Sequence, residues 1–369
     1  MGNKICFHGG KSFDAIGNDF KKLHKKHSII RSDVTDAWYN PHPDIEKILT
    51  KDLNWFIKNS PPTLSEGLIH TISKVRNIPN ENILVGGGSS DLMFQIFQHL
   101  IKKNDEVIIL DPMYGEYAHI LEHVVKAKIK RVKQTFESNF EINIDQIISA
   151  IGGKTKMIIL VNPNNPTGQY LTKKSVGELL RKMPKGITLC IDETYIDYIG
   201  KAESMETEVA NYSNLIVIKS MSKVYALSGI RVGYVATNKN IISDLNLFTP
   251  PWSVGLIGQL AGVIALENEK YYFKKIAKTK EINQHTFDQL LDIKGLIPIK
   301  TETNFILIKL PEHIKPEIIC KKLEMKNIFI RNPESQSTQL NNFIRISIKD
   351  KHTTKKIITE LNKQVLKFY

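Results

Sequence analysis

The sequence has little cysteine, and the cysteines that it has are far apart. Cys6, Cys190 and Cys320 form no C-x-x-C pair in a chain of 369 residues. Disulfide-stapled domains and zinc sites of the knuckle type need several cysteines at short spacings. We therefore expect neither a disulfide framework nor a bound metal.

The sequence also lacks a long hydrophobic run. The best candidate, from Val254 to Leu266, is interrupted by Gln259 and falls well short of the roughly 20 apolar residues that a membrane-crossing helix needs. The start of the chain, MGNKICFHGG, has no apolar core of a secretory signal, and Cys6 stands where myristoylation favours Ser or Thr. We expect no membrane partner and a cytoplasmic location.

Negative charge is scarce. The 38 acidic residues face 51 lysines and arginines, which gives a formal net charge of +13. Such a field favours anionic partners, either macromolecules or small phosphorylated metabolites. Nucleic-acid binding would need basic residues interleaved with aromatic ones on one face, whereas these lysines are scattered along the chain. We expect no nucleic-acid partner.

From about residue 83, short apolar segments alternate with helical patterns. This alternation predicts an α/β fold in which helices sandwich a mostly parallel sheet. Runs such as MIILV and TLCI are continuously apolar, which is typical of strands buried on both faces. The expected strands are Ile83–Val85, Glu106–Leu110, Lys128–Lys133, Lys156–Val161, Ile187–Ile191, Leu215–Lys219 and Val232–Ala236.

The pattern changes after Pro250 and Pro251. A long Lys- and Glu-rich helical stretch from about Gly255 to Leu291 indicates a connector. Further strands are expected near Asn304–Lys309, Ile328–Arg331 and Phe343–Ile348, with helices between and after them. This second block predicts a smaller α+β domain.

The length of the chain favours two domains. We expect residues 1–35 to form an N-terminal arm that joins the small domain, and residues 36–252 to form the large domain. Residues 253–369 would form the connector helix and the small C-terminal domain.

Polar motifs stand where several predicted strands end. Gly86–Asp91 (GGGSSD) links a strand to a helix, so its backbone N–H groups could bind an anion. Asn162–Gly168 (NPNNPTG), Asp192–Tyr195 (DETY) and Ser220–Lys223 (SMSK) follow three further strands, and Arg231 comes shortly after. Because parallel strands end at one edge of a sheet, where open α/β sheets bind ligands, these motifs predict one site.

The same motifs, together with DPMYGEY (Asp111–Tyr117) and NFIRIS (Asn342–Ser347), occur in a characteristic order. In this order and spacing, the chain resembles the fold-type I pyridoxal phosphate enzymes of the class I/II aminotransferase group over nearly its whole length. Within the group it is similar to histidinol-phosphate aminotransferase and to the threonine-phosphate decarboxylases. The resemblance implies pyridoxal 5'-phosphate as cofactor, a seven-stranded large domain that binds it, and a homodimer.

The resemblance also implies roles for individual residues around the ring of the cofactor. Lys223 matches the lysine that binds the cofactor covalently, and Asp192 matches the carboxylate that pairs with the ring nitrogen. Asn165 and Tyr195 match the donors to the phenolic oxygen of the ring. Tyr114 matches the aromatic residue that stacks on the ring.

The remaining implied roles concern anionic groups. The residues that match the binding site for the cofactor phosphate are Gly88, Ser89, Ser90, Ser220, Ser222 and Arg231. Arg345 matches the arginine that binds the substrate carboxylate, and His8 resembles an early histidine of the decarboxylases, so both are candidate substrate-binding residues.

General chemistry supports these roles. An anion facing the ring nitrogen keeps it protonated, and a protonated pyridine takes up the electron pair left at the substrate Cα when a bond breaks there. A lysine released from the cofactor can act as a general base. Lys223, Asp192 and Tyr195 are therefore the candidate catalytic residues, while the planar fork of Arg345 suits a carboxylate.

Two departures from the family pattern leave the substrate open. Lys58–Pro62 (KNSPP) stands where histidinol-phosphate aminotransferases have R-Y-P-D, so the tyrosine that reaches the neighbouring subunit's cofactor has no counterpart. Asp33–Pro41 (DVTDAWYNP) differs from the D-F-S and N-x-N-P pattern of the decarboxylases, although His8 favours them. Tyr39 and Ser60–Thr63 are the segments where we expect contacts from the second subunit.

We expect an aminotransferase that moves an amino group between glutamate, or a similar amino acid, and a small phosphorylated oxo compound. The alternative is a decarboxylase of phosphoserine or phosphothreonine. Ser220 and Lys223 also satisfy the S-x-x-K pattern of serine acyl-transferases, but the S-D-N and K-T-G motifs that accompany it are missing.

Overall fold

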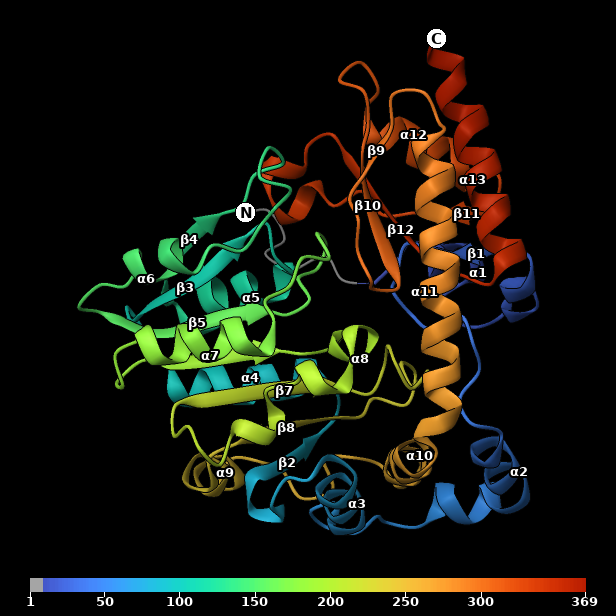
Figure 1. Ribbon diagram of the computed structural model, residues 1–369. Helices are drawn as coiled ribbons and strands as arrows, with labels where there is room; N and C mark the ends of the chain where they lie inside the picture. The colour runs from blue at the N-terminus through green and yellow to red at the C-terminus, as the bar shows by residue number, and fades with distance from the viewer. Residues whose placement is uncertain (1–8) are drawn as a thin grey trace.

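A seven-stranded sheet forms the centre of the larger part of the molecule. The computed structural model describes residues 9–369 and orders the strands β2-β8-β7-β6-β5-β3-β4 (Figure 1). β8 pairs antiparallel with β2 and β7, and the other pairs are parallel. The strands are β2 (Ile83–Gly86), β3 (Glu106–Asp111), β4 (Lys128–Lys133), β5 (Thr155–Val161), β6 (Thr188–Asp192), β7 (Leu215–Ser220) and β8 (Gly233–Thr237). The expected mostly parallel α/β sheet is confirmed.

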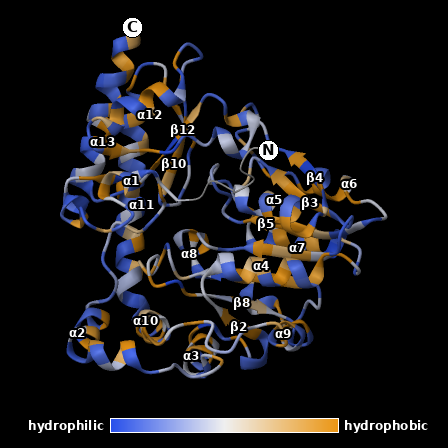
Figure 2. Cartoon of the chain, turned by 180° about the vertical axis from the view of Figure 1, so that it is seen from behind, coloured by the Kyte–Doolittle hydropathy of each residue, from blue (hydrophilic) through white to orange (hydrophobic). Residues whose placement is uncertain are grey.

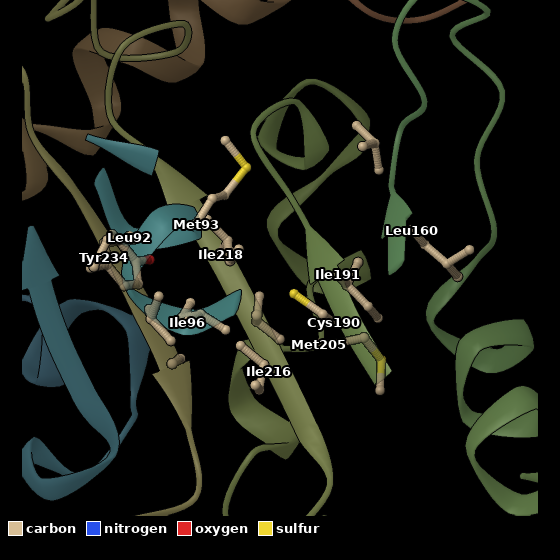
Figure 3. Packing of buried hydrophobic residues seen from close by; sticks show 14 of the residues in the cluster. Leu92, Met93, Ile96, Leu160, Cys190, Ile191, Met205, Ile216, Ile218 and Tyr234 are labelled. Carbon is tan, nitrogen blue, oxygen red and sulfur yellow. The ribbon is translucent and has the colours of Figure 1, made fainter. Parts of the chain in front are cut away.

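The core of this large part is buried because its central strands, β5 to β8, are apolar on both faces. Ile216 and Ile218 of β7 have no exposed surface, and Leu92 and Ile96 of helix α4 (Ser89–Leu100) point toward them (Figure 3). Burying one such aliphatic side chain contributes about 1.5–3 kcal/mol relative to exposing it. The hydrophobic strands stand out against mixed helices in Figure 2. The other helices of the sheet layers are α5 (Gly115–His119), α6 (Ile144–Ser149), α7 (Lys173–Lys182), α8 (Ile196–Ile199) and α9 (Lys239–Asn246).

Three helices close one end of the large part. Helices α2 (Pro43–Lys58) and α3 (Glu66–Arg76) both pack against α10 (Leu256–Glu267) (Figure 1). Gly262 of α10 permits the close approach of α3, since a Cβ atom there would lie 2.9 Å from Leu68 Cδ1.

The connector differs from the expected single helical stretch. It consists of two helices, α10 and α11 (Glu269–Leu291), separated at Asn268. The first half of α11 buries Tyr272 in the core of the large part, and the second half buries Leu290 in a separate core. One long helix therefore joins the two parts.

The small part is an α+β unit, as expected. Its antiparallel sheet has the order β12-β10-β9. The sequence patterns missed β9 because it has only two residues. The elements are β9 (Ile297–Pro298), β10 (Phe305–Lys309), α12 (Pro316–Glu324), β11 (Ile328–Phe329), β12 (Phe343–Ser347) and α13 (Lys351–Val365).

The N-terminal segment joins the small part. After the short helix α1 (Ser12–Ile16), strand β1 (Ile30–Arg31) pairs in parallel with β11. The domain limits at residues 35 and 252 stay a prediction. Across residues 9–369, no helix combines the length and the apolar character needed to cross a membrane.

Candidate active site

A pocket of about 200 Å³ gathers the residues that the sequence motifs indicated. The predicted residues that line it are Ser89, Ser90, Tyr114, Asn165, Asp192, Tyr195, Ser220, Ser222, Lys223, Arg231 and Arg345. Gly88 lies directly against Arg231, and His8 falls outside the described residues. Segments far apart in the sequence therefore form one site.

Asp192 ends β6 as a buried and oriented carboxylate. Its Oδ1 accepts hydrogen bonds from the Thr194 backbone N–H at 2.9 Å and the Thr194 hydroxyl at 2.6 Å. Its Oδ2 accepts one from the Tyr117 hydroxyl at 2.8 Å. Burial raises the pKa of Asp192, and the hydrogen bonds from Thr194 and Tyr117 counteract that rise. Tyr117 was not predicted as a site residue, although it belongs to the DPMYGEY motif.

The NPNNPTG loop is held so that Asn165 faces the pocket. The side chains of Asn162 and Asn164 donate to the backbone carbonyls of Leu171 and Pro112, which ties the loop to its surroundings. Gly168 has a φ of 76°, and a Cβ atom there would lie 2.2 Å from the Thr301 hydroxyl. Both the conformation and the close approach require glycine.

Two polar side chains meet next to Asn165. The Asn165 amide nitrogen lies 3.5 Å from the Tyr195 hydroxyl, which lies 2.8 Å from the Thr35 hydroxyl. Burial raises the pKa of Tyr195 to about 12, so the hydroxyl keeps its proton at neutral pH. The amide oxygen of Asn165 accepts a hydrogen bond from Arg345 at 2.7 Å.

Backbone and side-chain donors form a cradle for an anion. Gly88 precedes α4 with a φ of 100°, and a Cβ atom there would lie 2.5 Å from Nη2 of Arg231. The first N–H groups of α4, at Ser89 and Ser90, have no partner within the helix and point at bound anions in such sites. With the hydroxyls of Ser220 and Ser222, these groups fit a phosphate.

Lys223 has a charged partner that the sequence reasoning missed. Its Nζ donates a hydrogen bond to Asp36 Oδ1 at 2.8 Å. Tyr39, expected near a subunit contact, is buried and donates to the backbone carbonyl of Val224, beside Lys223. Through Asp36 and Tyr39, the segment before α2 thus contacts Lys223 and its neighbour Val224.

The small part contributes two arginines to the pocket. Arg331 and Arg345 lie directly opposite each other in an antiparallel bridge, so their side chains share one face. Arg345 Nη2 donates to the Asp33 backbone carbonyl at 2.9 Å, and Arg331 Nη1 donates to the Gly9 carbonyl at 2.7 Å. Burial, opposed by Tyr195 and aided by the neighbouring Arg331, lowers the pKa of Arg345 to about 10. Arg331 was not predicted, since no motif of the resemblance contains it.

This arrangement agrees with what is found among known proteins. The sequence profile described as aminotransferase class I and II matches residues 46–361. The chain belongs to this family. The histidinol-phosphate aminotransferase of Pelagibacter ubique is 30% identical over 341 residues, which cover 91% of this chain and 92% of that protein.

Solved structures of class I and II aminotransferase relatives share the fold. The histidinol-phosphate aminotransferase of Clostridium acetobutylicum has a TM-score of 0.81 at 25% identity, covering 90% of this chain and 99% of that one. The L-threonine-O-3-phosphate decarboxylase of Porphyromonas gingivalis has a TM-score of 0.81 at 21% identity, covering 92% and 100%. At 21% identity, the similarity to this decarboxylase concerns the fold alone. The expected family, fold and enzyme class, with pyridoxal phosphate as the cofactor, are confirmed.

The residues of this aminotransferase site fit pyridoxal phosphate. At position 88 the φ of 100° favours glycine, and a Cβ atom there would push the Arg231 guanidinium aside from a cradle that presents donors of the kind a phosphate needs. Lys223 and the buried carboxylate of Asp192 line the same pocket. A buried carboxylate has the chemistry to pair with a protonated ring nitrogen.

Proposed function

We propose that the protein transfers an amino group between glutamate, or a similar amino acid, and a small phosphorylated oxo compound. The observation that carries this proposal is the pair of arginines, Arg331 and Arg345, in a pocket that also contains Lys223 and a separate phosphate cradle. One anion site would serve the cofactor and the other the substrate. The relatives named above as histidinol-phosphate aminotransferases support a phosphorylated substrate.

The roles of the large-part residues follow from their chemistry. Gly88, Ser89, Ser90, Ser220, Ser222 and Arg231 would hold the cofactor phosphate, Tyr114 would stack on the ring, and Asn165 and Tyr195 would donate to its phenolic oxygen. When bound, pyridoxal phosphate withdraws the electron pair left at the substrate Cα. Asp192 would keep the ring nitrogen protonated, and Lys223 Nζ would accept the proton from Cα and return it.

The arginine pair would select the substrate. The fork of Arg345 suits the carboxylate of the amino donor, and the two guanidinium groups together suit a doubly charged phosphate of the acceptor. Asn165 already accepts from Arg345, which aims the guanidinium into the pocket. A role for His8 at this end stays a proposal, because that residue lies outside the described part of the chain.

A direct test is incubation of the purified enzyme with glutamate. We expect formation of 2-oxoglutarate and loss of the cofactor absorbance at about 420 nm, because the amino group stays on the cofactor. Phosphorylated ketones and aldehydes are then screened as acceptors that restore the absorbance. If glutamate yields no 2-oxoglutarate while phosphoserine or phosphothreonine releases CO₂, the decarboxylase alternative replaces transamination.

We further propose a cytoplasmic homodimer. The exposed apolar side chains Trp55, Leu64, Phe248 and Trp252 lie on α2, beside α3 and after α9, where a second copy could cover them. Ser60–Thr63 lies within this region. Cys190 and Cys320 are free and buried, which suits a reducing compartment. Sedimentation should give twice the chain mass of 42.1 kDa, and a monomer would contradict the dimer.

A further inference from the structure

We propose that Tyr117 is a positioning residue that holds Asp192 Oδ2 against the ring nitrogen of the cofactor and keeps the proton shared between them on that nitrogen. This inference rests on the proposed role of Asp192 as the carboxylate that faces the ring nitrogen. Tyr117 lies in helix α5, within the DPMYGEY motif, and is not among the residues that line the pocket. It would therefore act on the cofactor through Asp192 rather than by touching it.

Hydrogen bonds leave one side of the Asp192 carboxylate open. Oδ1 accepts from both the backbone N–H and the hydroxyl of Thr194, at 2.9 Å and 2.6 Å. Oδ2 accepts from the Tyr117 hydroxyl at 2.8 Å. Because each carboxylate oxygen can accept about two hydrogen bonds, the acceptor site that the described residues leave open is on Oδ2. The ring nitrogen would thus bind the same oxygen that Tyr117 holds.

The Tyr117 ring is fixed by its packing. The side chain has no exposed surface, and its ring centroid lies 5.8 Å from that of Phe97 in α4. The Tyr114 ring, expected to stack on the cofactor, meets the Tyr117 ring edge to face at 6.3 Å. These contacts give the Tyr117 hydroxyl one defined direction, so Asp192 Oδ2 cannot turn away without losing its hydrogen bond.

Tyr117 acts on Asp192 only as a donor. Burial raises the pKa of the Tyr117 hydroxyl well above its ordinary value, and the charge of Asp192 raises it further, so the hydroxyl keeps its proton. An O–H donor stabilises the ionised form of a carboxylate over its protonated form. Burial by itself favours the protonated form, since it raises the pKa of Asp192, and the hydrogen bonds from Thr194 and Tyr117 offset it.

The hydrogen bond matters because one proton is shared between Asp192 Oδ2 and the ring nitrogen. The proton can lie on the nitrogen, opposite a carboxylate, or on the oxygen, opposite a neutral ring. Donors to the carboxylate favour the first arrangement, because they stabilise its negative charge. A protonated ring takes up the electron pair from the substrate Cα more readily. Tyr117 would therefore speed the removal of the Cα proton without taking part in substrate binding.

The test uses the enzyme loaded with pyridoxal phosphate that carries nitrogen-15 in its ring, and NMR reads the protonation of that nitrogen. Tyr117→Phe removes the hydroxyl and keeps the ring that packs against Phe97 and Tyr114. We expect the ratio of protonated to unprotonated ring nitrogen to fall about tenfold, because a hydrogen bond to a charged group is lost. The kcat with glutamate should fall about three- to tenfold, while its KM changes less than about twofold.

Two controls make the result specific. Tyr234 is also buried, and its hydroxyl donates to Glu206 at 2.5 Å, but neither residue lines the pocket. Tyr234→Phe therefore loses the same kind of hydrogen bond and should leave the nitrogen signal and kcat unchanged. Asp192→Asn gives the signal of a ring nitrogen without a facing carboxylate. Adding Tyr117→Phe to Asp192→Asn should cause no further change, because Tyr117 acts through that carboxylate.

Identical nitrogen signals in the wild type and Tyr117→Phe would overturn the proposal, as would an effect of Tyr117→Phe that persists together with Asp192→Asn. If Tyr117→Phe does not fold, Tyr117→Leu, which also lacks the hydroxyl, must give the same change. Failure of the proposed function is distinguishable. A wild-type ring nitrogen without a proton would refute the role of Asp192 and this inference with it, whereas glutamate that yields no 2-oxoglutarate would refute transamination whatever Tyr117 does.

Discussion

Lys219 and Lys223 lie close together at the end of β7, yet they belong to two electrostatically different regions. Lys219 is buried in a charge cluster with Arg76, Glu193, Asp197 and Glu206. Its Nζ lies 3.3 Å from Glu193, 3.5 Å from Asp197 and 3.8 Å from Glu206. Among the described residues, Lys223 forms an ion pair with Asp36 alone, and its side chain is 22% exposed.

The surroundings decide which lysine can react. Burial by itself lowers the pKa of Lys219, but Asp197, Glu206 and Glu193 outweigh burial and raise it, so Lys219 stays an ammonium. Lys223, by contrast, has a single carboxylate partner among the described residues and is partly exposed to solvent. The difference teaches that a buried lysine held by several carboxylates is structural, whereas a partly exposed lysine with a single partner is available for chemistry.

Side-chain alternation separates the two regions. Asp192 and Ser220 line the pocket, while their neighbours Glu193 and Lys219 enter the charge cluster. Successive residues of a strand point to opposite sides, so the ends of β6 and β7 supply one residue to each region. The charge cluster thus lies directly behind the site and fixes the strand ends that carry it.

The largest expected effect is that of Lys223→Ala. This variant should lose the absorbance at about 420 nm and at least about a thousandfold in kcat/KM, because the nucleophile and base are removed. Its free energy of unfolding, measured with urea, should change by less than about 1 kcal/mol, since the lost ion pair is partly exposed. Lys182→Ala, an exposed lysine, serves as the control. Turnover that survives in Lys223→Ala would contradict the assignment.

Lys219→Met should show the opposite behaviour. Removing the ammonium takes the cation away from buried Glu193 and leaves Asp197 and Glu206 with Arg76. Breaking such a buried pair costs about 3–5 kcal/mol. Urea unfolding measures this loss, while the absorbance at about 420 nm should persist in the folded fraction. A stable variant that no longer binds the cofactor would reverse the roles of the two lysines.

A smaller effect is expected for Arg331→Ala. The KM for a phosphorylated acceptor should rise about ten- to a hundredfold, because a charged hydrogen-bond donor is lost, while kcat changes little. The KM of Arg331→Lys should lie between those of the wild type and Arg331→Ala, since an ammonium keeps the charge but cannot form a bidentate fork. Steady-state kinetics with phosphorylated and unphosphorylated acceptors checks this. Equal losses for both acceptors would assign Arg331 to the fold rather than to the phosphate.

The two halves of the site were not equally predictable from the sequence. The cradle, the NPNNPTG loop and the residues at the ends of β6 and β7 lie in short local motifs, because a strand end and the turn after it are encoded together. Asp36 meets Lys223 across 187 residues, and Arg331 meets Arg345 through pairing in the small part. Such neighbours come from the tertiary fold and lie outside any short local motif.

The charge cluster was missed for the same reason. Arg76 and Asp197 are 121 residues apart, and either could be a surface residue by its local pattern. The break between α10 and α11 at Asn268 was also missed, because asparagine continues a helical pattern without the signal that proline or glycine gives. The strands that were predicted lie within one or two residues of their observed bounds, whereas the two-residue strands β1 and β9 were missed.

The smallest expected effect concerns acid stability. The pKa of Asp36 in the folded protein, about 2, is below its ordinary value of 3.8, so the unfolded chain binds the proton more readily. The stabilisation from the Asp36–Lys223 pair is therefore complete above about pH 4 and is lost as the pH falls through about 2.

The difference in unfolding free energy between the wild type and Asp36→Asn should follow this loss. It should be about 1 kcal/mol at neutral pH, because solvent screens the partly exposed pair, and shrink toward zero near pH 2. Other acidic groups with lowered pKa, such as Asp197, are common to both proteins and cancel in the difference. Urea unfolding at both pH values measures it. A difference that persists in acid would mean that Asp36 acts by packing, and its charge would then have no part in distinguishing Lys223 from Lys219.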